Sequence, residues 1–295
     1  MGNVKELRGR IKSIGNIRQL TKAMEMVASM KLRRVQNKAV AYHGASRELR
    51  AMAARVSRVA EGYSELELPK LGEPSRFGVF VLSSDRGLCG AYNSKIGLEV
   101  LDFMDRKRKE RAEASFRFWV YGKKAYTYLH KRHFEVERYF VDPPLDKVRF
   151  EAAAMVGAEL GKAFLEGKVD EVYVAYTEFV SAGRFVPRVE RLLPLRRIVA
   201  DPEDEAATAS IDYLVEPDPV QLIKLFFEAY LNVSIYDVML QSLTSEHASR
   251  RMAMKNATDA AGRMQRELKL EYNRARQESI TKELLDIVGG ANAIA

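Results

Sequence analysis

The distribution of proline constrains this 295-residue chain more than any other feature. No proline occurs before Pro69, and none occurs in residues 220–288, where Gly262 is the only glycine. Proline breaks a helix and glycine weakens it, so both ends of the chain can form uninterrupted helices. At 1.5 Å per residue, residues 220–288 would make a rod of about 100 Å, too long for one globule. Such a helix pairs with another helix, lies inside a partner, or does both.

Apolar residues near the N-terminus recur at spacings of three and four, which predicts an α-helix with one apolar stripe. The stripe consists of Val4, Leu7, Ile11, Ile14, Ile17, Leu20, Met24, Val27 and Met30. Small residues and good helix formers continue the pattern to about Ala60. We interpret the stripe as a seam for another helix. At the start of the second long helix, two acids and two prolines at residues 216–219 suit a helix N-terminus.

Between these helices the sequence alternates between strand-like and helix-like segments. Runs rich in β-branched and aromatic residues predict strands at residues 77–82, 116–121, 169–176 and 187–195. Helices are predicted at residues 93–111, 123–132 and 150–167. This alternation favours an α/β domain with a mainly parallel sheet. We therefore predict an N-terminal helix at residues 1–68, an α/β domain at 69–205 and a C-terminal helix at 206–295.

The net charge of +8 is concentrated at the N-terminus. Residues 1–58 hold 14 Lys and Arg against 3 Asp and Glu, a local charge of +11, whereas residues 220–288 hold 10 against 9. A field of one sign on one element favours an acidic partner surface, a nucleic acid or an anionic membrane. An ordinary solvated helix face explains it equally well.

Composition excludes several classes of protein. With 47% apolar and 30% charged residues, the chain matches neither a disordered nor a membrane-spanning protein. Its most hydrophobic stretch is interrupted by Lys224, Glu228 and Asp237, so no transmembrane helix is expected. The single cysteine, Cys89, cannot form an internal disulfide and suits a reducing compartment. The basic N-terminus resembles a transit peptide in composition, but its pattern continues past residue 30 without a cleavage-like break.

Two motifs suggest chemistry only weakly. The turn at residues 83–93 follows the first predicted strand, where doubly wound domains bind phosphate, but it lacks both G-x-G-x-x-G and a P-loop lysine. We favour a structural turn with an inert cysteine. His130 and His133 have a metal-ligand spacing, but cations flank them and carboxylate ligands are missing. We therefore expect no catalytic, cofactor-binding or metal-binding residues, and no enzyme activity in the chain alone.

The end of the C-terminal helix is polar on every side. Residues 245–259 and 272–283 distribute charged and polar groups all around the helix, with small residues between them. A helix of this kind is stabilised by pairs four residues apart or enclosed by other protein. Beyond Val288 the chain carries no charge. We interpret this end as one that lies inside a protein sleeve.

Several motifs together resemble the gamma subunit family of F-type ATP synthases, of the bacterial type. They are Ile-Lys-Ser at 11–13, Leu-Thr-Lys-Ala-Met-Glu-Met-Val-Ala at 20–28, Lys-Leu-Arg at 31–33, Ser-Asp-Arg-Gly-Leu-Cys-Gly at 84–90, Glu-Pro-Asp-Pro at 216–219 and the closing pattern of residues 280–293. The resemblance covers essentially the whole chain. Ala91 stands where the family usually has a second glycine, and the chloroplast-type regulatory insertion with two cysteines is absent.

The resemblance implies an antiparallel coiled coil of the two terminal helices with a Rossmann-like α/β domain at its foot. It implies a central rotor shaft that couples ion-driven rotation of the membrane c-ring to the catalytic sites of the alpha3-beta3 ring, and that regulates ATPase activity and proton flow. The partners would be the alpha, beta and epsilon subunits and the c-ring, at the cytoplasmic face of the bacterial cell membrane. The implied contacts with the stator ring are Met24, Arg250, Arg276, Gln277 and Thr281.

Two other functions compete with the resemblance. A basic coiled-coil adaptor for nucleic acid would use the +11 segment, but the near-neutral C-terminal helix argues against it. A nucleotide-dependent α/β enzyme would use the turn after residue 82. Nucleotide binding by the isolated chain would favour that enzyme.

Overall fold

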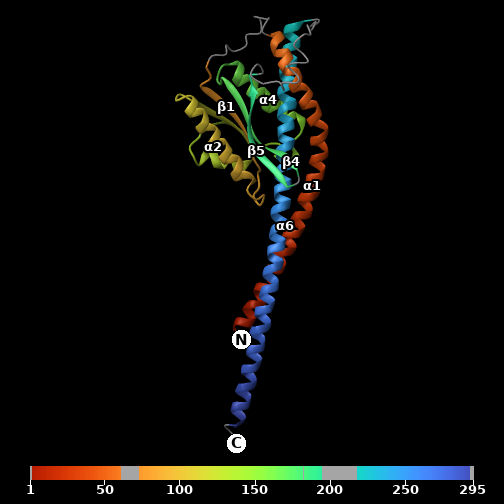
Figure 1. Ribbon diagram of the computed structural model, residues 1–295, viewed down its shortest axis with the longest axis vertical. Coiled ribbons are helices and arrows are strands. Elements are labelled where there is room, and N and C mark those ends of the chain that lie inside the picture. Colours follow the sequence, from red (N-terminus) through yellow and green to blue (C-terminus); the bar gives the residue numbers. More distant parts are fainter. Residues whose placement is uncertain (1, 61–72, 182, 195–217, 293–295) are drawn as a thin grey trace. The chain divides into compact units, whose positions relative to one another are not determined.

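Two long helices dominate the computed structural model, which describes residues 2–60, 73–181, 183–194 and 218–292 (Figure 1). Helix α1 spans Gly2–Ala60 and helix α6 spans Pro219–Asn292, 59 and 74 residues respectively. The predicted long terminal helices are confirmed. The predicted domain limits at residues 68/69 and 205/206 lie outside the described residues.

The chain divides into two compact units. One unit combines Met1–Ser29 with Arg250–Ala295, and we call it the shaft unit; the other is Met30–Ser249, and we call it the domain unit. Both long helices run through both units.

The start of α6 shows why the chain becomes helical there. The carboxylate of Asp218 accepts hydrogen bonds from the backbone N–H groups of Val220 and Gln221, at 3.0 and 3.3 Å. These N–H groups have no partner within the helix, so Asp218 acts as the cap. Pro219 occupies the first helical position, where its missing N–H costs nothing. The predicted helix start is confirmed for these residues.

The domain unit contains a sheet of five strands in the order β3-β2-β1-β4-β5. The strands are β1 (Arg76–Leu82), β2 (Ser115–Tyr121), β3 (Val136–Phe140), β4 (Glu171–Ser181) and β5 (Arg184–Leu193). Only the β4–β5 pair is antiparallel. The predicted, mainly parallel α/β sheet is confirmed. Strand β3 was not predicted, because two charged residues interrupt it and it pairs on one side only.

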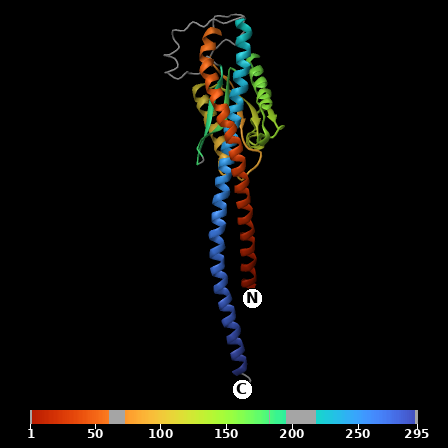
Figure 2. The ribbon, with the colours of Figure 1, turned by 90° about the vertical axis from the view of Figure 1, so that its right-hand side faces the viewer.

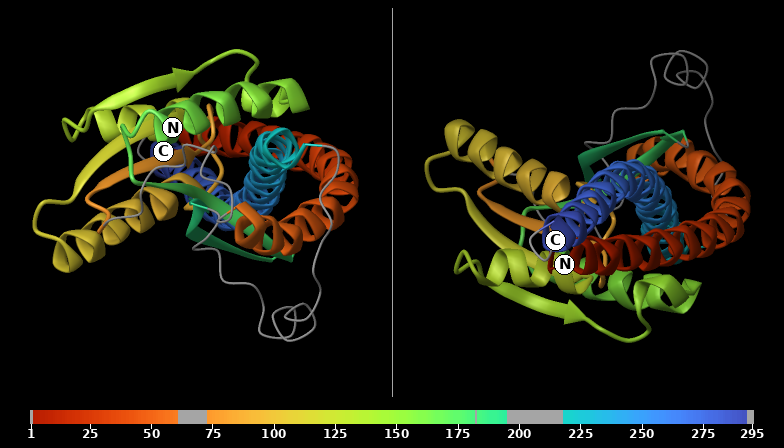
Figure 3. Two further views of the ribbon diagram at one scale, coloured as in Figure 1. Left: turned by 90° about the horizontal axis from the view of Figure 1, so that it is seen from above. Right: turned by 90° about the horizontal axis from the view of Figure 1, so that it is seen from below.

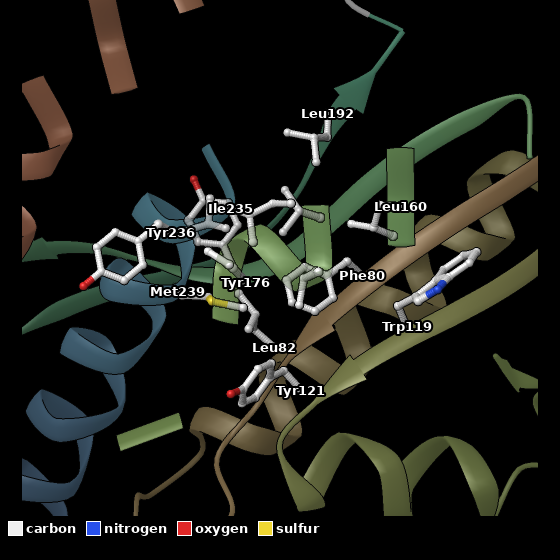
Figure 4. Close-up of a cluster of buried hydrophobic side chains, with 14 of the residues drawn as sticks. Phe80, Leu82, Trp119, Tyr121, Leu160, Tyr176, Leu192, Ile235, Tyr236 and Met239 are labelled. Carbon is white, nitrogen blue, oxygen red and sulfur yellow. The ribbon is translucent and has the colours of Figure 1, made fainter. Parts of the chain in front are cut away.

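Helices cover both faces of this sheet (Figure 3). They are α2 (Tyr92–Glu110), α3 (Lys123–His130), the short 3-10 helix η1 (Leu145–Lys147) and α4 (Phe150–Leu165). Alternate residues of β1 point to opposite faces: Val79 and Val81 pack with α2 and α3, while Phe80 and Leu82 pack with α4 and α6. Figure 4 shows the second of these cores, which includes Ile235 of α6. Part of the long helix is thus a core element of the domain.

In the shaft unit, α1 and α6 pair in opposite directions. Thr258 Oγ1 donates a hydrogen bond to Thr21 Oγ1 at 2.8 Å, inside the seam. Closer to the start of α1, a Cβ atom built on Gly15 would lie 3.1 Å from Gln265 Nε2. Between these two contacts the residue numbers fall along α1, from 21 to 15, and rise along α6, from 258 to 265. The pairing is therefore antiparallel, as predicted. Helix α6 continues past the start of α1 (Figures 1 and 2).

The composition of the predicted α1 seam is partly wrong. Within the shaft unit the buried positions are Leu7, Thr21 and Ala28, and Ile11 and Ile14 are half-buried, which gives heptad spacings. The remaining predicted seam residues with exposed side chains are Ile17, Leu20, Val27 and Met30. Three residues turn a helix by about 300°, so each three-residue step places the next side chain about 60° short of a full turn. Because the predicted stripe contains several such steps, it moves more than half-way round the helix between residues 7 and 30.

Candidate interaction site on the paired helices

The turn between β1 and α2 is held by its own side chains. Ser84 Oγ donates to the backbone oxygen of Arg86 at 2.6 Å, and the backbone N–H of Ser84 donates to Asn93 Oδ1 at 3.1 Å. Leu88 and Gly90 both have left-handed backbone, with φ of 62° and 58°. A non-glycine residue in that region is uncommon and requires support from its surroundings. The sequence therefore forms a tightly specified turn.

Helix α6 packs against this turn, whose counterpart in a doubly wound domain binds a nucleotide phosphate. Tyr92 Oη and Ser242 Oγ are hydrogen-bonded at 2.7 Å, and Ser249 Oγ donates to the backbone oxygen of Cys89 at 2.6 Å. Cys89 itself is 1% exposed. The turn therefore contacts the chain's own helix, as expected of a structural turn. This arrangement gives no support to the nucleotide-enzyme alternative.

His130 and His133 are the two histidines that we expect not to bind a metal ion. Both side chains are exposed. Within the part of the chain that the structure describes, no group of three His, Cys, Asp or Glu residues is placed to hold a metal ion.

An ion pair links α1 to the short helix η1 in the domain unit. Lys31 Nζ lies 3.0 Å from Asp146 Oδ2. Partial burial of Asp146 acts to raise the pKa of its carboxyl, but the hydrogen bond and charge of Lys31 outweigh it, and the pKa is lowered. Nearby, desolvation raises the pKa of the Tyr121 hydroxyl to about 12, and this hydroxyl donates to the backbone oxygen of Pro143. The ion pair thus ties α1 to η1, and the Tyr121 hydroxyl ties the segment around Pro143 to strand β2.

The five residues expected to touch a stator ring occupy different parts of the shaft unit. Met24 of α1 and Arg250 of α6 are half-buried, whereas Arg276, Gln277 and Thr281 are exposed. Twenty-six residues separate Arg250 from Arg276, which is about 39 Å along a helix. The structure therefore brings three of these residues together near the end of α6 and leaves the other two as separate positions.

The end of α6 is amphipathic. Successive residues of a helix lie about 100° apart around its axis. Among residues 276–288, one arc of about 140° around this axis contains all but one of the apolar side chains together with three polar ones. The residues of this arc, which we call the tip face, are Arg276, Gln277, Ile280, Thr281, Leu284, Ile287 and Val288. The opposite arc holds Glu278, Ser279, Lys282, Glu283 and Asp286, and the exposed Leu285 lies between the two arcs. Every tip-face side chain is exposed, so the described chain leaves an apolar surface uncovered beside the three expected contact residues.

A second uncovered apolar surface lies on α1. Leu20, Met24, Val27 and Met30 fall within an arc of about 120°. Leu20 and Met30 are 62% and 65% exposed. Met24 is less exposed because it lies between this outer face and the buried seam. The expected contact at Met24 thus sits at the border of an apolar surface.

The outward orientation of these two surfaces was not predicted from the sequence. Sequence reasoning assigned Leu20, Val27 and Met30 to the seam between the helices, although strict heptad spacing from Leu7 leads to Thr21 and Ala28. It also treated the end of α6 as polar on all sides. Plotting residues 276–288 around the helix axis would have separated the apolar arc from the acidic one.

The chain matches the family described as ATP synthase over residues 3–294. It is 37% identical to an ATP synthase gamma chain of Chlorobium phaeobacteroides over 300 residues, covering 100% of this chain and 99% of that protein. An ATP synthase gamma chain of Bdellovibrio bacteriovorus is 35% identical over 298 residues, with 100% and 99% coverage.

Solved structures agree with these relatives. A chain from the central stalk and c-ring of the Tetrahymena thermophila mitochondrial ATP synthase is 25% identical, with a TM-score of 0.58 and coverage of 81% of this chain and 99% of that chain. A chain from the Euglena gracilis mitochondrial ATP synthase rotor is 16% identical and shares the fold, with a TM-score of 0.64 and coverage of 95% and 99%. No helix among the described residues is both long and apolar enough to cross a bilayer.

Proposed function

The chain belongs to the ATP synthase gamma-chain family, and on that premise we propose how its helices perform the family's function. It is the non-catalytic central-stalk subunit of an ATP synthase and part of the peripheral F1 sector. Its partners are the F1 subunits and the membrane c-ring. Rotation of this shaft presents a different side to each catalytic site in turn, which couples ion flow to nucleotide affinity by direct contact.

One observation carries this function: a single 74-residue helix has an inner stretch buried in the domain unit and an uncovered stretch near its C-terminal end. Residues 230–249 form part of the core of the domain unit, whereas none of residues 269–288 is buried. A helix that exposes an apolar arc over its last turns needs a partner surface to cover it. This distribution of burial is expected of a shaft whose helix packs in the core of its own domain and inserts its far end into a partner.

We infer separate roles for the expected contact residues. Arg276 and Gln277 would hydrogen-bond to a loop of a beta subunit, and Thr281 would contribute to the same contact. Their position on the tip face, beside Ile280 and Leu284, supports this role because the apolar arc brings the partner close. Buried polar groups at an interface are costly unless they are paired, so such bonds fix the shaft's position.

Met24 and Arg250 would make separate contacts, away from the tip face. Met24 would face the acidic lever segments of beta, where a flexible thioether adapts to changing surfaces. The excess of cations on α1 favours that acidic partner. Arg250 would bind carboxylates through its two-pronged guanidinium group. The α/β domain would rest with the epsilon subunit on the c-ring.

Co-purification tests the function directly. An affinity tag belongs between α3 and β3, where Lys131 and Arg132 are exposed, because a tag at either helix end would obstruct insertion. We expect alpha, beta and epsilon subunits to be captured with the tagged chain. The isolated chain should have no ATPase activity, and activity should follow beta during purification. Turnover that survives removal of beta, or capture without alpha and beta, would contradict the proposal.

A further inference from the structure

The two long helices are attached to the α/β domain very unequally. Within the domain unit, 17 of the 20 residues 230–249 of α6 are buried, but only 3 of the 20 residues 30–49 of α1 are. Helix α6 therefore passes through the domain core, while α1 lies largely at its surface.

The polar contacts repeat this asymmetry. The turn at residues 83–92 binds α6 at two levels, through Tyr92 with Ser242 and through the Cys89 carbonyl with Ser249. Both bonds are buried. Helix α1 contributes the ion pair of Lys31 with Asp146, whose side chains are 45% and 34% exposed. Ion pairs in contact with water add little to stability, so α1 is the weaker attachment.

The two anchoring serines are placed to resist rotation of α6. They are seven residues apart, so they lie on the same face of the helix within about 20° and about 10 Å apart along its axis. Apolar packing is not directional and allows small sliding movements. Hydrogen bonds depend on direction, and two of them at different heights oppose both rolling and tilting.

The turn itself is fixed to the sheet on its other side. Ser83 Oγ donates to the backbone oxygen of Gly122, and it accepts from the backbone N–H of Ala125 at 2.8 Å. Asp85 Oδ1 accepts from the backbone N–H of Lys123 at 3.0 Å. A Cβ at Gly122 would lie 2.1 Å from the backbone oxygen of Ser83, which shows how closely the two segments approach. A continuous polar path thus runs from β2 and α3 through the turn to α6.

We propose that the turn at residues 83–92 is a clamp that transmits torque between the α/β domain and α6, and that α6 rather than α1 carries this torque. Tyr92 and Ser249 are its positioning residues. The inference rests on the proposed function of the chain as a shaft. It assigns a mechanical role to a turn whose place in the fold resembles that of a phosphate-binding loop.

Two small substitutions remove the clamp's bonds while keeping its shape. Tyr92→Phe removes the hydroxyl that is bonded to Ser242, and Ser249→Ala removes the hydroxyl that donates to the Cys89 carbonyl. Matched controls on α1 are Tyr42→Phe, whose ring packs edge-on against Tyr236, and Ser29→Ala, whose hydroxyl bonds within its own helix. Amide hydrogen exchange of the full-length chain is measured first, in the turn and in residues 242–249 of α6.

We expect exchange in these segments to accelerate about five-fold for each clamp variant and roughly 30-fold for the double variant, as lost buried hydrogen bonds raise local opening. The α1 controls should leave exchange in these segments unchanged. Equal exchange in the double variant and the wild type would overturn the clamp, because the two bonds would then add nothing to the joint.

The second measurement uses the assembled complex. The alpha3-beta3 ring is held fixed, and a rotation probe is attached to the α/β domain. We expect wider angular fluctuations of the probe in the double clamp variant, and wild-type fluctuations in both α1 controls. Wild-type fluctuations in the double clamp variant would overturn the inference, because the two bonds would then carry no torque. If the wild-type complex shows no ATP-driven rotation, the proposed shaft function fails instead, which separates the two results.

Discussion

Two stretches of the same helix, residues 230–249 and 269–288 of α6, have opposite environments. The first is packed inside the domain unit, and Ile235 within it is 0% exposed. The second contains no buried residue, and Leu285 within it is 67% exposed. Helix propensity does not distinguish them, since both are helical without a break. One stretch therefore takes its stability from this chain, whereas the other provides an apolar surface for a partner.

The two stretches should differ most in what they contribute to stability. Ile235→Ala should lower the free energy of unfolding of the isolated chain by about 3 to 4 kcal/mol, because it leaves a cavity in a close-packed core. Leu285→Ala, the matched change in the outer stretch, should alter it by less than about 0.5 kcal/mol. Denaturant titration of the two purified variants measures the difference. Similar losses in both would mean that the outer stretch also packs within the chain.

The sequence supports most of the fold because it depends on patterns that lie within one segment. Proline-free ends, the Asp218–Pro219 helix start and the β-branched runs are local signals, and they predicted both long helices and four of the five strands. Strand β3 was missed because an edge strand needs no apolar alternation on both faces. Its Glu137 and Arg138 are exposed.

Predicting the site was harder, since burial by a partner and burial by the same chain look alike in a sequence. Ser245, Glu246 and Ser249 belong to the polar stretch that suggested an enclosing partner, yet the domain unit itself buries them. Only the three-dimensional contact of Ser249 with the turn after β1 reveals this. The contact residues Met24, Arg250, Arg276, Gln277 and Thr281 came from the family resemblance and stay a prediction.

Polar residues of the tip face should matter in the assembled complex and hardly at all in the isolated chain. Replacing Arg276 and Gln277 together with Ala should change the isolated chain's stability by less than about 0.5 kcal/mol, since both side chains are exposed. In the complex, each beta-loop group left buried without a partner should cost about 1 to 3 kcal/mol. We expect slower synthesis and hydrolysis, or weaker assembly.

A matched control lies on the opposite arc of the same turns. Replacing Glu278 and Lys282 with Ala should leave turnover of the complex near wild type, because these residues point away from the tip face. Wild-type turnover in the Arg276 and Gln277 double variant would show that the tip is a passive bearing surface. Those two residues would then have no place in the contact.

Met24→Lys tests the other uncovered surface, on α1. A cation at the border of this apolar face could form a new charge-assisted hydrogen bond with an acidic segment of beta, worth about 1.5 kcal/mol. Rotation would have to break that bond, which slows the affected step about ten-fold. We expect ATP hydrolysis to persist while ion transport per ATP falls. Unchanged transport per ATP, measured in vesicles beside hydrolysis, would show that Met24 is not at this contact.

The smallest effect tests how weakly α1 is attached. Lys31 lowers the pKa of Asp146 in the folded chain, so the folded state binds a proton less readily than the unfolded state. The ion pair therefore adds stability above the unfolded pKa of about 4, and this stability is lost as the pH falls through the lowered folded pKa.

Asp146→Asn should consequently reduce stability by less than about 0.5 kcal/mol at pH 7, in keeping with a water-exposed ion pair. The difference from wild type should disappear as the pH falls through the lowered folded pKa of Asp146, because the wild-type carboxyl then also becomes neutral. Thermal melting of both proteins across this pH range measures it, with Asp105→Asn on the exposed face of α2 as the control. A loss at pH 7 as large as that of Ile235→Ala would show that α1 is anchored as firmly as α6, and the unequal attachment of the two helices would no longer explain which one carries the torque.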